Sequence, residues 1–277
     1  SFPTRRSSDL ESAIMIIMMI YVVAALINLK IPDTGARYVS QKTNPIELVK
    51  DFAICFKTLW NDRLGQISLA VTTLFWGAGA TLQFIVIKWA QVALHMNLSQ
   101  GAILQAISAV GVAGGAVYAA WRIPLRRSLD VLPYGIAMGL VVCVMAVYNS
   151  DLLPNTSIFS FGKFDVTLNL LPAYILLILV GWLAGYFVVP MNALLQHRGH
   201  VLMSAGHSIA VQNFNENISV LMMLLIYSGL IWLDAPIQGV IIGFGVAVSA
   251  IMWLVIKRHA ANQAEYDSMH LIGEHKH

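Results

Sequence analysis

The sequence predicts an all-α protein that crosses a membrane several times, and three observations support this fold class. Of the 277 residues, 58% are hydrophobic and only 11% are charged, whereas a soluble domain keeps about 25% of its residues charged. Seven apolar runs are long enough to span a hydrocarbon core about 30 Å thick. Because lipid offers no hydrogen-bond partner to an open backbone, each run is expected to be a helix.

The expected spans follow one another along most of the chain. They cover residues 13–29, 66–94, 101–121, 131–148, 170–196, 202–233 and 238–256. Several spans carry two glycines four residues apart, a spacing that lets helices approach closely in a membrane. These pairs are Gly111/Gly115, Gly135/Gly139, Gly181/Gly185 and Gly239/Gly243. They predict that the spans pack against one another as a bundle.

The residues outside the spans divide the chain further. Residues 1–12 begin with SFPTRRSSDL, which looks like translated adapter sequence, so we assign them to a non-native or disordered leader. The first transmembrane helix, 13–30, lacks a small-residue cleavage site and is not expected to be a removable signal peptide. A central loop, 31–65, precedes the remaining spans, 66–258, and residues 259–277 form a tail.

An amphipathic helix is expected inside the central loop, at residues 45–60. Asn44 can cap its start, Pro45 occupies the first position, and Glu47 follows three residues after the cap. Apolar residues then recur at helical spacing opposite Lys50 and Lys57, which is typical of a helix that lies in the membrane interface. This helix is either a stiff tether between bundles or a docking surface for a partner.

Basic residues are concentrated in alternate connections between the spans. The connections after the first, third, fifth and seventh spans carry Lys and Arg, whereas 149–169 carries only Lys163 and 93–100 carries none. Because positive charge stays inside, these basic connections and the C-terminus are predicted to be cytoplasmic. Seven spans would then place the N-terminus outside, where Arg5 and Arg6 fit badly. This misfit supports the leader assignment and indicates a truncated chain.

The sequence signatures of enzymes are missing. The chain contains no HExxH, GxSxG or CxxC motif and no glycine-rich phosphate loop. His197 and His200 lie in an expected polar loop and do not favour metal binding, and Cys55 and Cys143 predict no disulfide framework. The net charge of +3 is too small and too dispersed for nucleic-acid binding. We therefore expect no enzyme activity, no metal and no cofactor.

A polar stretch in the middle of the sixth span is the most unusual feature of the sequence. Within six residues it contains Gln212, Asn213, Asn215, Glu216 and Asn217. These residues fall near the expected centre of the bilayer, where an acid costs about 2.5–3.5 kcal/mol. On a helix they share a polar arc of roughly 200°, opposite an apolar arc. We expect this helix to line a cavity, in which Glu216 meets a cation or stays protonated.

Three other polar side chains are candidates for the same cavity. Asn192 and Gln196 stand four residues apart on the fifth span and share a face, either for interhelical hydrogen bonds or for lining the path. Gln83 is the strongly polar residue in the inner part of the second span, whereas Lys88 is expected to extend to the interface. Pro190 is expected to break or kink the fifth span, before a short basic hairpin.

Three segments closely resemble the bacterial lysophospholipid transporters of the major facilitator superfamily. They are LFWGAGATLQF (74–84), GYFVVPMNALLQHRG (185–199) and AGHSIAVQNFNEN (205–217). The similarity covers about residues 13–258. It implies the C-terminal six-helix half of a twelve-helix transporter plus the preceding sixth helix, with the N-terminal half absent. Some members of the family carry a basic residue where Gln83 stands, so an amide would here replace it in contacting a phosphate.

The resemblance implies a role in phospholipid remodelling at the bacterial inner membrane. Lysophosphatidylethanolamine and lysophosphatidylglycerol would cross that membrane for reacylation by a partner acyltransferase coupled to an acyl-carrier-protein synthetase; no cofactor is implied. Because facilitator sites lie between the two halves, one wall of the headgroup pocket would come from Gln83, Asn192, Gln196, Gln212, Asn213 and Glu216.

This wall alone is expected to transport nothing. Two alternatives stay open for the function. One is a facilitator that exports drugs or small amphiphiles, which would share the architecture. The other is a non-transporting membrane scaffold for an acyltransferase.

Overall fold

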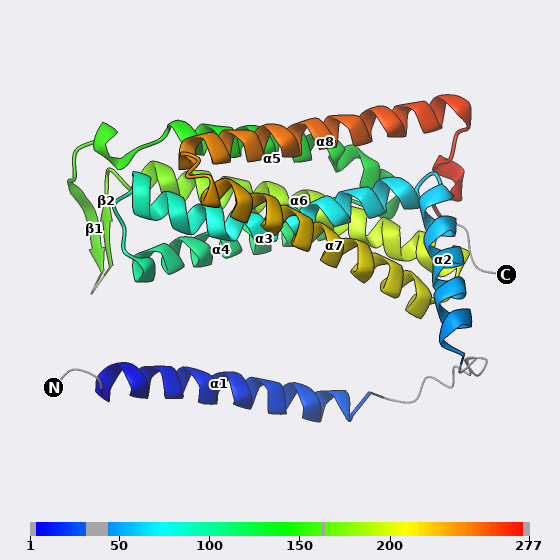
Figure 1. Ribbon diagram of the computed structural model, residues 1–277, viewed down its shortest axis with the longest axis horizontal. Coiled ribbons are helices and arrows are strands. Elements are labelled where there is room, and N and C mark those ends of the chain that lie inside the picture. Colours follow the sequence, from blue (N-terminus) through cyan, green and yellow to red (C-terminus); the bar gives the residue numbers. More distant parts are fainter. Residues whose placement is uncertain (1–3, 32–43, 162–163, 274–277) are drawn as a thin grey trace. The chain divides into compact units, whose positions relative to one another are not determined.

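The computed structural model describes residues 4–31, 44–161 and 164–273. It divides into two units, residues 1–45 and 46–277, which are described separately. The first unit contains α1, Thr4–Asn28, whose segment Glu11–Asn28 is long and apolar enough to span a membrane (Figure 1). Helix α1 thus includes residues 4–12, which we assigned to a leader; their origin outside the native protein stays a prediction.

The second unit is a helical bundle. Its helices are α2 (Pro45–Asn61), α3 (Gly65–Ala93), α4 (Leu98–Arg122), α5 (Leu132–Val147), α6 (Leu171–Leu202), α7 (Ala205–Trp232) and α8 (Ile237–Glu265). In the described part of the chain, seven helical segments are long and apolar enough to cross a membrane: α1, α3, α4, the segment Leu125–Val147 that contains α5, and α6 to α8. The prediction of an all-α multi-pass membrane protein is confirmed.

Helices α3 and α6 form the centre of this bundle. Figure 1 shows α4 alongside α6 and α5 alongside α8, with α7 next to α3. Trp89 of α3 and Phe187 and Leu177 of α6 are fully buried in the core of the bundle. The short helix α2 lies across one end of the bundle, and a small β-hairpin lies at the other end (Figure 1).

Glycines allow α4 and α6 to pack backbone against backbone. A Cβ atom on Gly115 would overlap the carbonyl oxygen of Trp182, and one on Gly185 would overlap that of Val112. The predicted pairs on these two helices therefore make close contacts. The prediction for Gly239 and Gly243 of α8 was wrong.

In α8 a different glycine makes the contact. A Cβ on Gly243 would meet open space, whereas one on Gly245 would lie 2.5 Å from the carbonyl oxygen of Gly139 on α5. Spacing alone marks a helix as able to pack closely, but it does not say which of its faces meets a neighbour.

Helix α6 runs without interruption through Pro190, so the predicted break there was wrong. A proline removes one backbone hydrogen bond, and membrane helices tolerate this loss where neighbouring helices hold the flanking turns. Here Phe187 and Met191, on either side of the proline, are fully buried in the bundle.

The predicted basic hairpin after α6 is also helical. Helix α6 continues to Leu202, so His197, Arg198 and His200 lie in its last turns rather than in a loop. Arg198 is buried and pairs with Asp62 from the turn between α2 and α3, with 2.7 Å between Nη2 and Oδ2. This ion pair lets a charged helical end pack inside the protein.

The connection between α5 and α6 contains short regular elements. A 3₁₀ turn, η2 (Ser150–Leu152), is followed by the antiparallel strands β1 (Ser157–Phe161) and β2 (Phe164–Thr167). Two further 3₁₀ segments are η1 (Leu125–Val131) before α5 and η3 (Met269–Leu271) after α8.

Candidate functional site

The first turn of α7 fixes where its polar stretch lies. Ser204 caps the helix, because its hydroxyl accepts a hydrogen bond from the backbone N–H of His207 at 3.3 Å. One turn later, Ser208 packs directly on Gly199 of α6, where a Cβ atom would overlap the serine hydroxyl. Residues 212–217 therefore begin about two turns into α7, next to the C-terminal half of α6.

Three predicted site residues form one hydrogen-bonded group, which we call the amide–acid cluster: Asn192, Gln212 and Glu216. The side-chain amide of Gln212 donates from Nε2 to Oδ1 of Asn192 at 3.0 Å and to Oε1 of Glu216 at 2.7 Å. Gln212 and Glu216 are buried, and Asn192 is half-buried. Helices α6 and α7 thus contact each other through polar side chains at the level of Gln212 and Glu216.

The amide–acid cluster presents hydrogen-bond acceptors. Both N–H groups of Gln212 Nε2 donate inside the cluster. Within the described residues, two oxygen atoms of the cluster accept no hydrogen bond: Oε1 of Gln212 and Oε2 of Glu216. Within the part of the chain that the structure describes, Glu216 forms no ion pair with a basic side chain. A group with spare acceptors and a carboxyl suits a ligand that brings N–H donors or positive charge.

Helix α2 supports the other side of the polar stretch. Trp60 donates from Nε1 to Oδ1 of Asn215 at 3.3 Å, and Asn215 in turn donates to the carbonyl of Val211 at 2.8 Å. The rings of Phe52 and Phe214 meet edge-on with centroids 5.1 Å apart. Sequence reasoning missed this contact, although the aromatic residues spaced four apart on α2 marked the face that packs.

The remaining polar residues of α7 do not join the cluster. Asn213 is exposed, and its carbonyl accepts a hydrogen bond from Asn217 at 2.7 Å. The predicted polar arc is divided between two environments: Gln212, Asn215 and Glu216 are buried against neighbours, while Asn213 and Asn217 lie on the exposed side. Gln196 of α6 is also exposed, one turn beyond Asn192.

Gln83 lines a separate hollow between α3, α4, α6 and α7, which we call the four-helix concavity. It has a volume of roughly 500 Å³, and its walls include Trp76, Gln83, Gln105, Ser108 and Val220. Gln105 donates from Nε2 to the backbone carbonyl of Gln83 at 2.7 Å.

Val220 connects the concavity to the cluster. It follows Glu216 by four residues, so the concavity begins about one helical turn from the amide–acid cluster. Sequence reasoning missed Gln105 and Ser108, because isolated polar residues in α4 gave no motif.

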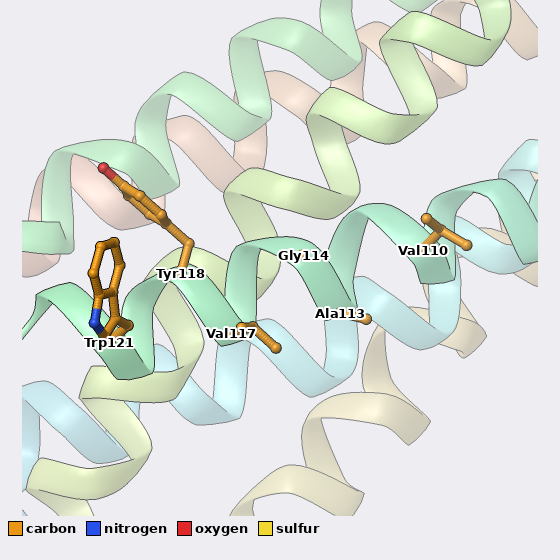
Figure 2. A pocket seen from close by; sticks show the side chains of 6 residues that line it. All are labelled: Val110, Ala113, Gly114, Val117, Tyr118 and Trp121. Atoms are coloured by element: carbon orange, nitrogen blue, oxygen red, sulfur yellow. The ribbon is translucent and has the colours of Figure 1, made fainter.

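A third hollow, of roughly 570 Å³, lies on α4 alone. Figure 2 shows its lining side chains, with Trp121 and Tyr118 near one end and Val110 at the other. Apart from the Tyr118 hydroxyl and the Trp121 indole N–H, this surface offers a ligand only apolar contacts. It suits acyl chains and has no charged group to recognise a polar head.

Comparison with known proteins identifies bacterial relatives. "Lysophospholipid transporter LplT" of Escherichia coli O1:K1 / APEC is 36% identical over 252 residues, which cover 89% of this chain and 58% of the relative. The protein of the same name from Shigella boydii serotype 4 (strain Sb227) is 37% identical over 244 residues, or 86% of this chain and 56% of the relative. The resemblance drawn from the three sequence segments is confirmed.

The chain spans less than three-fifths of the length of these curated relatives. No protein-family model matches the chain, and no solved structure does.

Proposed function

We propose that this chain, as a relative of the bacterial lysophospholipid transporters, forms the larger part of a carrier that moves lysophospholipids across a membrane. The observation that carries the proposal is the amide–acid cluster, in which a buried Glu216 accepts a hydrogen bond from Gln212 at 2.7 Å in the middle of a membrane-length helix. Such a residue is costly to place there and is by default functional.

The chemistry of a lysophospholipid matches the two polar regions of the bundle. Its headgroup is zwitterionic or anionic and needs polar contacts, whereas its single acyl chain can stay against apolar side chains. In our proposal the amide–acid cluster receives the ammonium or a proton, and Gln83 with Gln105 at the four-helix concavity contacts the phosphate region. The amides can donate to phosphate oxygens, although they carry no positive charge.

The site is proposed as one wall of a two-walled pocket. In facilitators the substrate lies between two halves near the midplane, and the curated relatives include segments that this chain does not match. Asn213 and Gln196, which are exposed, would act only if the facing wall closes over them. We place the carrier in the bacterial inner membrane with a cytoplasmic C-terminus and an acyltransferase as the partner that consumes its product. We propose no enzymatic step for the chain itself.

Lipid flipping by the complete gene product in proteoliposomes tests the proposal. Labelled lysophosphatidylethanolamine should move between leaflets in the wild type, and Glu216→Gln should slow it at least tenfold, since roughly 1.5–3 kcal/mol attaches to a charged hydrogen bond. A protein that moves drugs or dyes but not lysophospholipid would support the exporter alternative.

The scaffold alternative predicts a different pattern. It expects Glu216→Gln to leave lysophospholipid uptake unchanged and changes on α2 to abolish it. Deleting α2 would not separate the two, because Trp60 and Phe52 contact α7. Val49→Lys is the sharper change, since Val49 is 68% exposed and the substitution leaves Trp60 and Phe52 in place. Loss of uptake in this variant alone would favour the scaffold.

A further inference from the structure

The segments at the end of the bundle opposite α2 (Figure 1) surround a polar hollow. It has a volume of roughly 490 Å³ and is formed by the turn between α3 and α4, by η2 and by the residues that lead into α6. Its polar lining includes His95, Gln100, Asp151, Asn155, Thr167 and Asn169. None of these residues belongs to the amide–acid cluster or to the four-helix concavity.

The hollow is held in shape by hydrogen bonds between the segments that form it. The buried Ser150 donates from Oγ to the carbonyl of Ala93 at 3.1 Å, which ties η2 to the end of α3. The Tyr148 hydroxyl donates to the carbonyl of Asn169 at 2.5 Å, which ties the end of α5 to the start of α6. These two hydrogen bonds hold the segments around the hollow together.

Two buried acceptors in the walls of the hollow lack donors. Oγ1 of Thr167 and Oδ1 of Asn169 are buried, and within the described residues neither has a hydrogen-bond partner. The carboxylate of Asp151 contacts Nε2 of His95 at 3.4 Å through Oδ2. Buried acceptors without donors are uncommon in proteins, and one explanation is a ligand that supplies the donors.

We propose that this hollow binds the primary ammonium of an ethanolamine-type phospholipid headgroup. An ammonium group offers three N–H donors and a positive charge. These match Asn169 Oδ1, Thr167 Oγ1 and the Asp151 carboxylate, while the His95 imidazole at the rim can face the phosphate. A glycerol headgroup has no charge to pair with Asp151.

The inference rests on the proposed function for the identity of the substrate. It adds a preference for one headgroup over another. The hollow that would impose this preference lies at the end of the bundle that the loop charges predict to be outside. The hollow would select the lipid before it reaches the amide–acid cluster.

Uptake of two lysophospholipids by the complete gene product in proteoliposomes tests the inference. For Asp151→Asn we expect the apparent KM for lysophosphatidylethanolamine to rise roughly five- to tenfold, as for the loss of a charged hydrogen bond. The KM for lysophosphatidylglycerol should stay within about twofold of the wild-type value on the same reasoning. Asn169→Leu should act in the same direction.

Asp130→Asn is the matched control, because Asp130 also forms an exposed ion pair, with Arg127 at 2.7 Å, and lies outside the hollow. An unchanged KM for the ethanolamine lipid in Asp151→Asn, or an equal rise for both lipids, would overturn the inference.

A binding measurement separates the inference from the proposed function. Titration calorimetry with glycerophosphoethanolamine and glycerophosphoglycerol needs no transport and no acyl chain. Preference for the ethanolamine compound in the wild type, lost in Asp151→Asn, supports the hollow even if no lipid is moved. Equal binding of both compounds, or binding of neither, refutes it. If the binding preference is present but neither lipid is transported, only the proposed function fails.

Discussion

Trp60 of α2 and Asn215 of α7 are joined by a hydrogen bond of 3.3 Å between Nε1 and Oδ1, across 155 positions of sequence. Asn215 is the neighbour of Glu216 and lies on the buried side of α7. The bond therefore fixes the rotation of α7 about its axis where that helix carries the amide–acid cluster. Helix α2 is in this way part of the support of the candidate site.

Replacing Trp60 with Phe should weaken transport without unfolding the protein. The variant keeps a ring beside Phe56 but removes the N–H, and a hydrogen bond of this kind contributes about 1 kcal/mol. We expect an apparent KM several-fold higher, measured by lysophospholipid uptake. Trp232→Phe, at a side chain that is 83% exposed at the end of α7, is the control and should behave as wild type.

Glu216→Gln should separate function from stability. The substitution keeps the shape and a hydrogen-bonding group but removes the acid, so transport should fall at least tenfold. The thermal midpoint should stay the same or rise, because a buried acid without an ion pair is costly to a membrane helix. Both are measurable on purified protein. A lower midpoint with normal transport would mean that Glu216 only stabilises the bundle.

Gln212→Ala and Asn213→Ala form a matched pair at adjacent positions. The first removes both hydrogen bonds of the cluster and should reduce uptake strongly, whereas the second changes an exposed side chain outside the cluster and should have a smaller effect. Uptake of one labelled lysophospholipid compares them directly. If Asn213→Ala were the more damaging change, the binding wall would lie on the exposed face of α7.

Arg198→Met should destabilise the bundle by about 3–5 kcal/mol, because it leaves the carboxylate of Asp62 buried without its partner. The side chains of Arg198 and Asp62 are 3% and 9% exposed. The double variant Arg198→Met with Asp62→Leu should recover part of the loss. Chemical denaturation in detergent gives the comparison, and a single variant as stable as wild type would contradict it.

Cys55 of α2 offers a test of orientation and of pH dependence. Burial, with a smaller effect of the nearby Asp51 carboxylate, raises the pKa of the Cys55 thiol. The thiolate fraction at neutral pH is therefore low, and alkylation should accelerate as pH rises through the raised pKa. Asp51→Asn should lower that pKa and speed labelling at neutral pH.

With Cys143 replaced by Ser, an impermeant maleimide should label Cys55 in inside-out vesicles. Labelling in right-side-out vesicles instead would reverse the orientation expected from the loop charges.

The spans were predictable because hydropathy over about twenty residues depends on the lipid solvent and hardly on the neighbours. The site was predictable only in part. The sequence identified Gln212 and Glu216 as costly, but a helical wheel cannot say that Asn213 faces away, since that depends on where α2 and α6 pack. The uninterrupted course of α6 through Pro190 likewise depends on buried neighbours that local sequence does not reveal.

The glycine contacts between α4 and α6 have a mechanical consequence. Backbone carbonyl groups of each helix occupy the space that side chains of the other helix would fill. Sliding of one helix along the other would bring the two backbones into collision, so α4 and α6 should move together as one rigid body. Helix α7 meets Gly77 of α3 through the hydroxyl of Ser219 and the flexible thioether of Met223, which can yield. Any change in the width of the four-helix concavity would then come from movement between α3 and α7, while the α4–α6 pair forms its fixed side.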